Sequence, residues 1–210
     1  MLRPGAVWLV LVMAVSGLAA CSSRPSAPAS RPADSLAQCL QRLDTAHVSY
    51  ERAKDFSTPE GCGVSQAVRV RRSTIDWNRP AMMSCPLAAT VADFETTVVQ
   101  PAAQRTFGQA VRRMSNAGSY NCRGEIGGRA ERISQHGYGR AIDVTGFELA
   151  DGTVISVAKD WRNKGAKSTF LHEVAQGACR VFNLVITPNR NYEHHDHLHL
   201  DIGPYKMCGY

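Results

Sequence analysis

Residues 192–202 read YEHHDHLHLDI and contain four of the seven histidines of this 210-residue chain. From residue 197 onward polar and apolar side chains alternate, which is the pattern of a strand with one buried face. On such a strand His197, His199 and Asp201 share one face, with the two imidazoles roughly 7 Å apart, and leucines occupy the other face. The segment therefore predicts a strand that packs on the core and presents a metal or catalytic site. The alternative is a solvated polar turn.

A second polar motif, SQHGYGRAIDV at residues 134–144, places His136 and Asp143 seven positions apart. On a helix this spacing would separate them by about 10.5 Å, which is too far for one metal ion. Gly137 and Gly139 disfavour a helix and allow a tight loop, so that Asp143 on a following strand can face His136. Combined with the late H-x-H, two histidines and an aspartate leave one coordination position open, as in a catalytic zinc site.

These motifs resemble those of a known group of enzymes. The pattern S-x-H-x-x-G-x-A-x-D followed by a late H-x-H is similar to that of zinc peptidases that cut D-alanyl bonds and cross-links in peptidoglycan, including D-Ala-D-Ala dipeptidases, carboxypeptidases and murein endopeptidases. The cysteine-bearing form, with SYNCR before the motif and HHDHLHLDIG after it, resembles the bacterial extensin-like C-terminal domain family. The resemblance covers residues 35–210, and the matching positions are Ser134, His136, Gly139, Ala141 and Asp143.

The resemblance implies a role for each matching residue. It implies Zn²⁺ as the cofactor, held by His136, Asp143 and His199. It also implies that His197 assists catalysis. Substrate contacts would come from Arg123, which pairs with carbonyl or carboxylate groups, and from Ser134, which holds a substrate carboxylate.

The general base stays open among three residues. Related dipeptidases carry a glutamate three residues before the last ligand, and this chain has the shorter Asp196 there. Endopeptidase-like members use histidines, and His194 lies about where a second histidine would be. His197, whose ordinary pKa lies near the working pH, is the third candidate.

Three functions are compatible with these features. The first is a zinc-dependent peptidoglycan peptidase that hydrolyses D-alanyl or cross-link amide bonds by metal-assisted chemistry. The second is a non-catalytic, metal-containing lipoprotein that binds the cell wall. The third is a periplasmic metal-binding or sensing protein, which would need neither an open coordination position nor Arg123. The partner is peptidoglycan peptide stems in the first case, and we treat the chain as a monomer.

The N-terminal segment predicts export and lipidation. Residues 1–20 have one basic residue, an apolar run and small residues, which is typical of a signal peptide. The following LAAC resembles a lipobox with Cys21 as the lipidated residue, ordinary signal cleavage being the alternative. By the known sorting pattern, Ser22 favours the outer membrane of a Gram-negative bacterium. Residues 21–34 then predict a Ser/Pro/Ala-rich tether, and residues 35–210 a single folded domain.

Charge and cysteine content narrow the class of partner and the kind of covalent cross-link that we expect. The formal net charge of +6 is spread along the chain, which suits an anionic cell-wall or membrane partner. An exported chain without an aromatic–basic module is not expected to bind nucleic acid. The six cysteines other than Cys21 predict three disulfides, and sequential pairing would give 39–62, 85–122 and 179–208. Zinc–thiolate binding is the alternative, but the chain has no C-x-x-C pair.

The order of elements predicts an α+β fold with a largely antiparallel sheet flanked by helices, and the resemblance implies the D-Ala-D-Ala metallopeptidase fold. Amphipathic spacing indicates helices, and Pro101 is expected to kink the second one. Alternation and turn residues indicate strands, including a hairpin around Asp151 and Gly152. The expected helices are 34–44, 85–114 and 167–182, and the expected strands lie within 64–72, 118–123, 139–156, 183–187 and 196–203.

Overall fold

A computed structural model describes Met1 and residues 34–125 and 132–209. The predicted signal peptide, the lipidation site at Cys21 and nearly all of the tether lie outside these residues. The helices and strands all belong to the unit Asp34–Tyr210. Within the described residues, no helix has the length and apolar character needed to cross a membrane.

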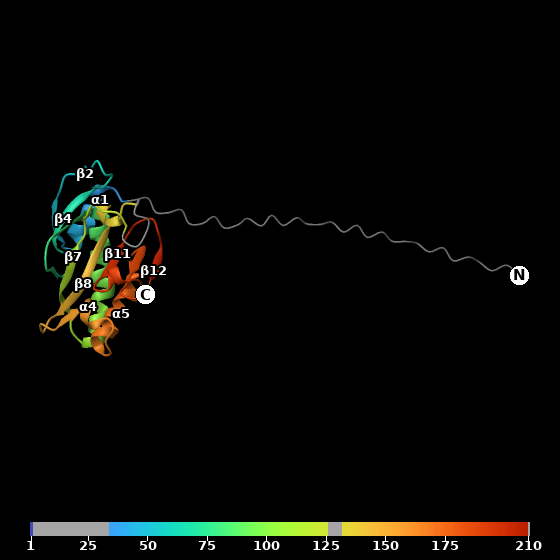
Figure 1. Ribbon diagram of the computed structural model, residues 1–210. Helices are drawn as coiled ribbons and strands as arrows, with labels where there is room; N and C mark the ends of the chain where they lie inside the picture. The colour runs from blue at the N-terminus through green and yellow to red at the C-terminus, as the bar shows by residue number, and fades with distance from the viewer. Residues whose placement is uncertain (2–33, 126–131, 210) are drawn as a thin grey trace. The chain divides into compact units, whose positions relative to one another are not determined.

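A seven-stranded sheet forms the centre of this unit (Figure 1). Its strand order is β12-β10-β11-β8-β7-β5, and β9 also pairs with β8. The pairs β10–β12 and β5–β7 are parallel and the others are antiparallel. In chain order the strands are β5 (Asp76–Trp77), β7 (Val111–Gly118), β8 (Ala141–Leu149), β9 (Val154–Ser156), β10 (Leu184–Ile186), β11 (Leu198–Asp201) and β12 (Met207–Gly209).

Two smaller sheets complete the β structure. One is antiparallel with the order β1-β4-β6, built from β1 (Ser49–Arg52), β4 (Ala67–Arg72) and β6 (Ala81–Ser84). The other pairs β2 (Phe56–Ser57) with β3 (Gly63–Val64). The α+β class with a mostly antiparallel main sheet is therefore confirmed.

The helices are interspersed with the strands in sequence, and a capping box defines the start of the first. Ser35 and Gln38 form a capping box at the start of α1 (Leu36–Thr45), because each side chain accepts a hydrogen bond from the other's backbone N–H. A continuous helical stretch follows β6, consisting of α2 (Cys85–Phe94), a π-helical turn (Glu95–Val99) and α3 (Gln100–Phe107). Short α4 (Val157–Asp160) precedes α5 (Ala166–Ala178), and both lie at the end of the body away from α1 and β2 (Figure 1).

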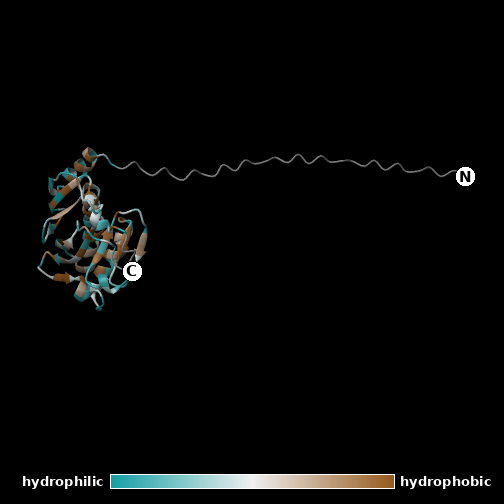
Figure 2. Ribbon diagram, turned by 45° about the horizontal axis from the view of Figure 1, so that its top comes forward, coloured by the Kyte–Doolittle hydropathy of each residue, from teal (hydrophilic) through white to brown (hydrophobic). Residues whose placement is uncertain are grey.

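Helices and the main sheet share one hydrophobic core. Phe147 of β8 packs edge-to-face on Phe170 of α5, and Phe94 of α2 packs edge-to-face on Phe182. Gly177 of α5 lies against the π-helical turn, where an added Cβ would come within 2.3 Å of Val98. Hydrophobic segments run through the strands and helices of the whole body rather than gathering at one end (Figure 2).

Two predicted elements differ in the structure. The helix expected over 85–114 ends at Phe107, because Gly108 adopts the left-handed conformation (φ 68°) that ends helices, and β7 begins three residues later. The strand expected at 118–123 is absent, since β7 ends at Gly118. Residues 120 and 121 instead make isolated backbone bonds to Met82 and His136. Pro101, expected to kink or break this helix, does not end the helical stretch, and the π-helical turn lies just before it.

The disulfides are Cys39–Cys85, Cys62–Cys122 and Cys179–Cys208. The predicted pairs 39–62 and 85–122 are therefore wrong, and 179–208 is confirmed. Helix α1 packs on α2, which brings Cys39 to the first residue of α2 and leaves Cys62 to meet Cys122 near the end of β7. All six cysteines are oxidised, so the zinc–thiolate alternative fails.

Candidate metal centre

Strand pairing brings the two histidine motifs together. In the antiparallel ladder of β8 and β11, His199 lies directly opposite Asp143. Leu198 and Leu200 on the other face are fully buried. His136 reaches the same place from a short 3-10 helix (Gln135–Tyr138) just before β8. Gly139 ends this turn in the left-handed conformation, and so the chain doubles back as its glycine pattern predicts.

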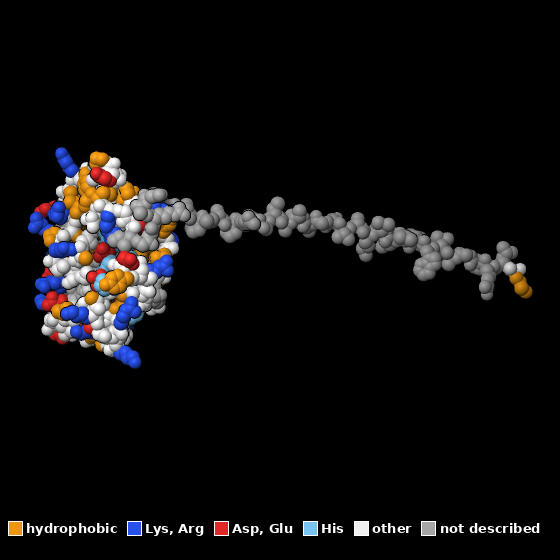
Figure 3. Space-filling view, viewed as in Figure 1, with side chains coloured by type: hydrophobic (Ala, Val, Ile, Leu, Met, Phe, Trp, Pro, Cys, Tyr) orange, Lys and Arg blue, Asp and Glu red, His pale blue; other side chains and the backbone are white. Residues whose placement is uncertain are grey.

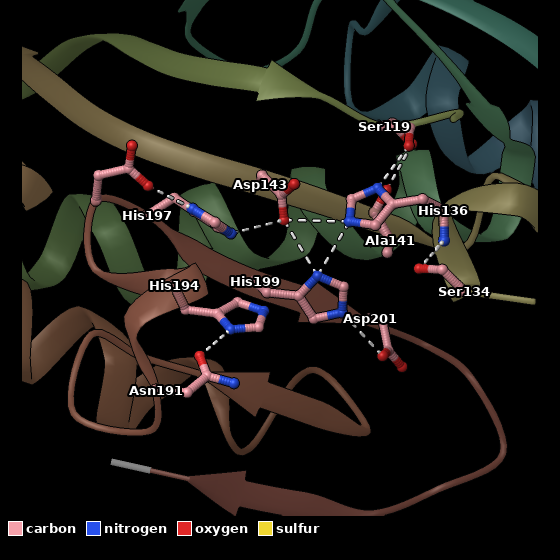
Figure 4. A network of polar contacts seen from close by, with 11 residues as sticks. Ser119, Ser134, His136, Ala141, Asp143, Asn191, His194, His197, His199 and Asp201 are labelled. Atoms are coloured by element: carbon pink, nitrogen blue, oxygen red, sulfur yellow. Dashed lines mark hydrogen bonds and ion pairs between the residues drawn. The ribbon is translucent and has the colours of Figure 1, made fainter. Parts of the chain in front are cut away.

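Three ligand atoms converge at this point (Figure 4). Nε2 of His136 is 3.0 Å from Nδ1 of His199, and Oδ1 of Asp143 is 3.2 and 3.1 Å from these two atoms. Bonds of 2.0–2.1 Å to a tetrahedral zinc ion would place its ligand atoms about 3.3 Å apart. The three side chains therefore fit one face of a tetrahedral site, and they form the group in the described residues that is suited to hold a metal ion.

Hydrogen bonds behind the histidines orient their rings. Nδ1 of His136 donates to the carbonyl of Ser119 at 2.6 Å. Nε2 of His199 donates to Oδ2 of Asp201 at 3.2 Å, and the other oxygen of Asp201 accepts from the backbone N–H of Gly203. With those protons placed, Nε2 of His136 and Nδ1 of His199 face the Asp143 carboxylate, and either a proton or a metal ion can lie between them.

The pKa values of the cluster reflect the same arrangement. Burial opposes ionisation of Asp143, but hydrogen bonds from His136 and His199 hold its pKa well below the usual range. Burial also opposes a charge on His199, yet hydrogen bonds to Asp143 and Asp201 raise its pKa to about 9. The centre is thus built to hold positive charge beside a buried carboxylate.

His197 approaches the centre from the end of the loop before β11. Its Nε2 is 3.5 Å from Oδ1 of Asp143, and its Nδ1 donates to Oδ1 of Asp196 at 2.8 Å. The hydrogen bond from His197 lowers the pKa of Asp196, whose side chain is about half exposed. Asp196 therefore lies behind His197 and does not face the ligand atoms itself.

His194 is buried beside the same group. Its Nδ1 donates to Oδ1 of Asn191, and its ring centre is 5.1 Å from that of His197 and 5.8 Å from that of His199. Burial, followed by the charges of His199 and His197, lowers the pKa of His194 to about 4. His194 is accordingly neutral at physiological pH. His195 points elsewhere, stacking on Tyr192 with ring centres 4.7 Å apart.

A cavity of about 440 Å³ opens beside His194 and His199. Arg123 and Ser134 line it, as expected for residues that contact a substrate. Ser134 is buried, and its hydroxyl also accepts a hydrogen bond from the backbone N–H of His136. Histidine side chains reach the surface on this side of the body, with acidic and basic side chains around them (Figure 3).

Sequence motifs pointed to some of these residues and not to others. The structure brings together His136, Asp143, His199, His197 and His194, and their individual functions stay predictions. The motifs gave no indication of Ser119, Asn191 or Arg190. Asn191 lies one helical turn before His194, and that spacing was the available signal. Trp77 and Trp161 are buried in the core, so they do not offer a surface on which a sugar could stack.

Comparison with protein families gives one match. The family model described as Extensin-like protein C-terminus matches residues 37–209, which is most of the chain. Comparisons with curated proteins and with solved structures returned no match.

Proposed function

The chain belongs to the extensin-like protein C-terminus family, and we propose that it is a zinc-dependent peptidase of peptidoglycan. Its substrates would be D-alanyl or cross-link amide bonds in the peptide stems, and its fold that of the D-Ala-D-Ala metallopeptidases. The observation that carries the proposal is the convergence of three potential ligand atoms, from His136, Asp143 and His199, beside a cavity.

The donor set fits zinc in particular. Two imidazole nitrogens and one carboxylate oxygen are a known type of ligand set in catalytic zinc sites, which leave one position for water or substrate, and a bound metal ion would displace the proton shared by His199 and Asp143. A bound zinc ion would supply a Lewis acid that assists amide hydrolysis. The cavity next to His199 argues against a metal buffer or sensor, because such a protein needs no space for a ligand of peptide size.

His197 is the residue best placed to move the proton. Its Nδ1–H is held by Asp196, so its Nε2 carries the lone pair and faces the centre at 3.5 Å from Asp143. We assign Nε2 as the acceptor of the proton from the attacking water and as its donor to the leaving amine. Asp196 orients this ring and stabilises its charged form, in the manner of the aspartate of a catalytic triad.

His194, Arg123 and Ser134 have supporting functions in this proposal. His194 is neutral and its Nδ1 is committed to Asn191, so its Nε2 is available for a hydrogen bond to substrate. Arg123 would stabilise negative charge that develops during attack or that ends the peptide. Ser134, which lines the cavity and accepts a hydrogen bond from the backbone N–H of His136, would contact the substrate carboxylate.

The N-terminal segment places this domain at its substrate. We propose that Cys21 is lipidated, that the lipid inserts into the outer membrane, and that the domain faces the periplasm on its tether. Such an anchor raises the effective concentration of enzyme at an insoluble wall without any new contact. Labelled palmitate should enter the wild-type chain and not Cys21→Ala.

The test uses the oxidised chain from residue 22 onward, incubated with purified peptidoglycan and defined cross-linked muropeptides with and without zinc. Mass spectrometry of the products identifies the bond. Zinc-dependent cleavage should be lost in His199→Ala and retained in His47→Asn, which removes an exposed histidine elsewhere. Zinc bound without cleavage would instead indicate a non-catalytic, wall-binding lipoprotein.

A further inference from the structure

The cavity beside the centre has a basic and apolar wall, of which the proposed chemistry uses only Arg123. On the side formed by β10 and β12, Leu184, Ile186 and Met207 give it an apolar surface. Arginine side chains surround this surface: Arg123 near the end of β7, Arg132 before the 3-10 helix, and Arg190 after β10. The cavity is therefore suited to a ligand that is anionic and partly apolar.

As far as the described residues go, few acidic groups offset the positive charge of this wall. Among the described residues, no carboxylate forms an ion pair with Arg123, Arg132 or Arg190. Arg132 instead lies over the ring of Tyr205, with 5.1 Å between its guanidinium carbon and the ring centre. The described lining contains two carboxylates. Asp201 is hydrogen-bonded to His199 and Gly203, so Glu125 is the one that remains to offset the arginines.

Arg190 stands on a turn that is anchored from several sides. Its backbone N–H donates to the carbonyl of Thr187, and the hydroxyl of Thr187 donates to the carbonyl of Gly209 on β12. Trp161 donates from its indole nitrogen to Asn189 at 2.9 Å. These bonds anchor the backbone of the turn from which the Arg190 side chain projects.

The same turn connects Arg190 to the catalytic group. The next residue, Asn191, accepts the hydrogen bond from Nδ1 of His194. Arg162 holds the turn from its other side by donating to the carbonyl of Pro188 at 2.8 Å. Arg190 and His194 therefore line the same cavity from one anchored segment.

We propose that Arg190 binds a carboxylate of the peptide substrate and so determines its specificity. The inference rests on the proposed function for the identity of the ligand as a wall peptide. A planar guanidinium pairs with a carboxylate through two parallel hydrogen bonds, and the apolar surface of Leu184, Ile186 and Met207 accommodates the adjoining methyl groups. The carboxylate comes either from the chain end of a stem peptide or from one of its acidic side chains.

The test measures binding separately from turnover. Zinc-loaded protein carrying His197→Ala, which lacks the proposed proton acceptor, is titrated calorimetrically with three synthetic stem pentapeptides. One has all carboxylates free, one has an amide at its C-terminus, and one has its side-chain carboxylates amidated. We expect one of the two amidations to weaken binding about 10-fold, and the affected peptide identifies the source of the carboxylate.

Variants then assign the effect to Arg190. Arg190→Ala should remove the preference for the free carboxylate, and Arg190→Lys should restore part of it. Arg180→Ala, which removes an exposed arginine outside the described lining of this cavity, should behave like the parent. Bound zinc in each variant confirms an intact centre.

The inference is overturned if the three peptides bind equally to the parent, or if Arg190→Ala keeps the preference. It is also overturned if Arg180→Ala loses as much of this preference as Arg190→Ala does. Failure of the proposed function would give a different result. The chain with His197 intact would then cleave none of the peptides but would still bind the free carboxylate form more tightly than the amidated form.

Discussion

Asp196 holds the Nδ1–H of His197 at 2.8 Å and thereby turns Nε2 of His197 toward Asp143. The two residues are adjacent in the chain, yet only His197 faces the metal centre. In our proposal, His197 is therefore the proton acceptor among the three candidates for the general base, and Asp196 is the carboxylate that orients it. The proposed roles of His197 and Asp196 can be tested by substitution, as can the contribution of surrounding residues to metal binding and stability.

His197→Ala should abolish most activity without removing the metal. Loss of a general acid–base typically lowers kcat by about 10²–10⁴-fold, while the ligands His136, Asp143 and His199 remain. Zinc content by mass spectrometry and kcat on a muropeptide are measured together. His195→Ala is the matched control, because that neighbouring ring stacks on Tyr192 and points away. Equal losses in the two variants would contradict the assignment.

Asp196→Asn should lower kcat less than His197→Ala does. The asparagine carbonyl still accepts from Nδ1 of His197 and keeps the ring orientation, but the negative charge that stabilises the protonated ring is gone. We expect a decrease of at least about 10-fold in kcat with little change in KM, measured on the same muropeptide. A decrease as large as that of His197→Ala would indicate that Asp196 accepts the proton itself.

Asp201→Asn should weaken zinc binding by about 10–100-fold, which is the usual cost of losing a carboxylate behind a ligating histidine. Asp201 holds Nε2 of His199, and its replacement allows the ring to present the wrong nitrogen. Competition with a fluorescent chelator gives the affinity. Asp160→Asn, on α4, is the control. An unchanged affinity in Asp201→Asn would show that the Asp201 hydrogen bond does not orient a ligand.

Removing the Cys39–Cys85 disulfide should destabilise the fold by about 2–5 kcal/mol. The bridge joins α1 to the first residue of α2 across 46 positions, and both sulfurs are buried in the core. The double variant Cys39→Ala, Cys85→Ala is compared with wild type by urea unfolding under oxidising conditions. Peptide mapping of the unreduced protein checks the pairing itself, and a 39–62 peptide would contradict the structure.

The sequence predicted which His and Asp residues cluster better than it predicted the disulfide pairing, for a physical reason. The alternation in HLHLD sets the face of β11, and the glycines after His136 permit the turn that brings it back to Asp143, so both signals are local. Cys39 and Cys85 meet because two helices pack, which no local pattern records. Likewise, Asn191 and Arg190 lie on a turn held by Trp161, a tertiary contact that spacing alone does not reveal.

Glu95 should make stability depend on pH. It is fully buried in the π-helical turn, where burial raises its pKa despite hydrogen bonds from Thr74 and Trp77. As pH rises above the ordinary value of 4.5, the folded state holds a proton that the unfolded state releases, so the free energy of unfolding falls until the folded pKa is passed. Glu95→Gln has no such proton. The stability of wild type relative to Glu95→Gln, from urea unfolding at several pH values, should therefore decrease with rising pH. A constant difference between wild type and Glu95→Gln across this pH range would contradict the raised pKa.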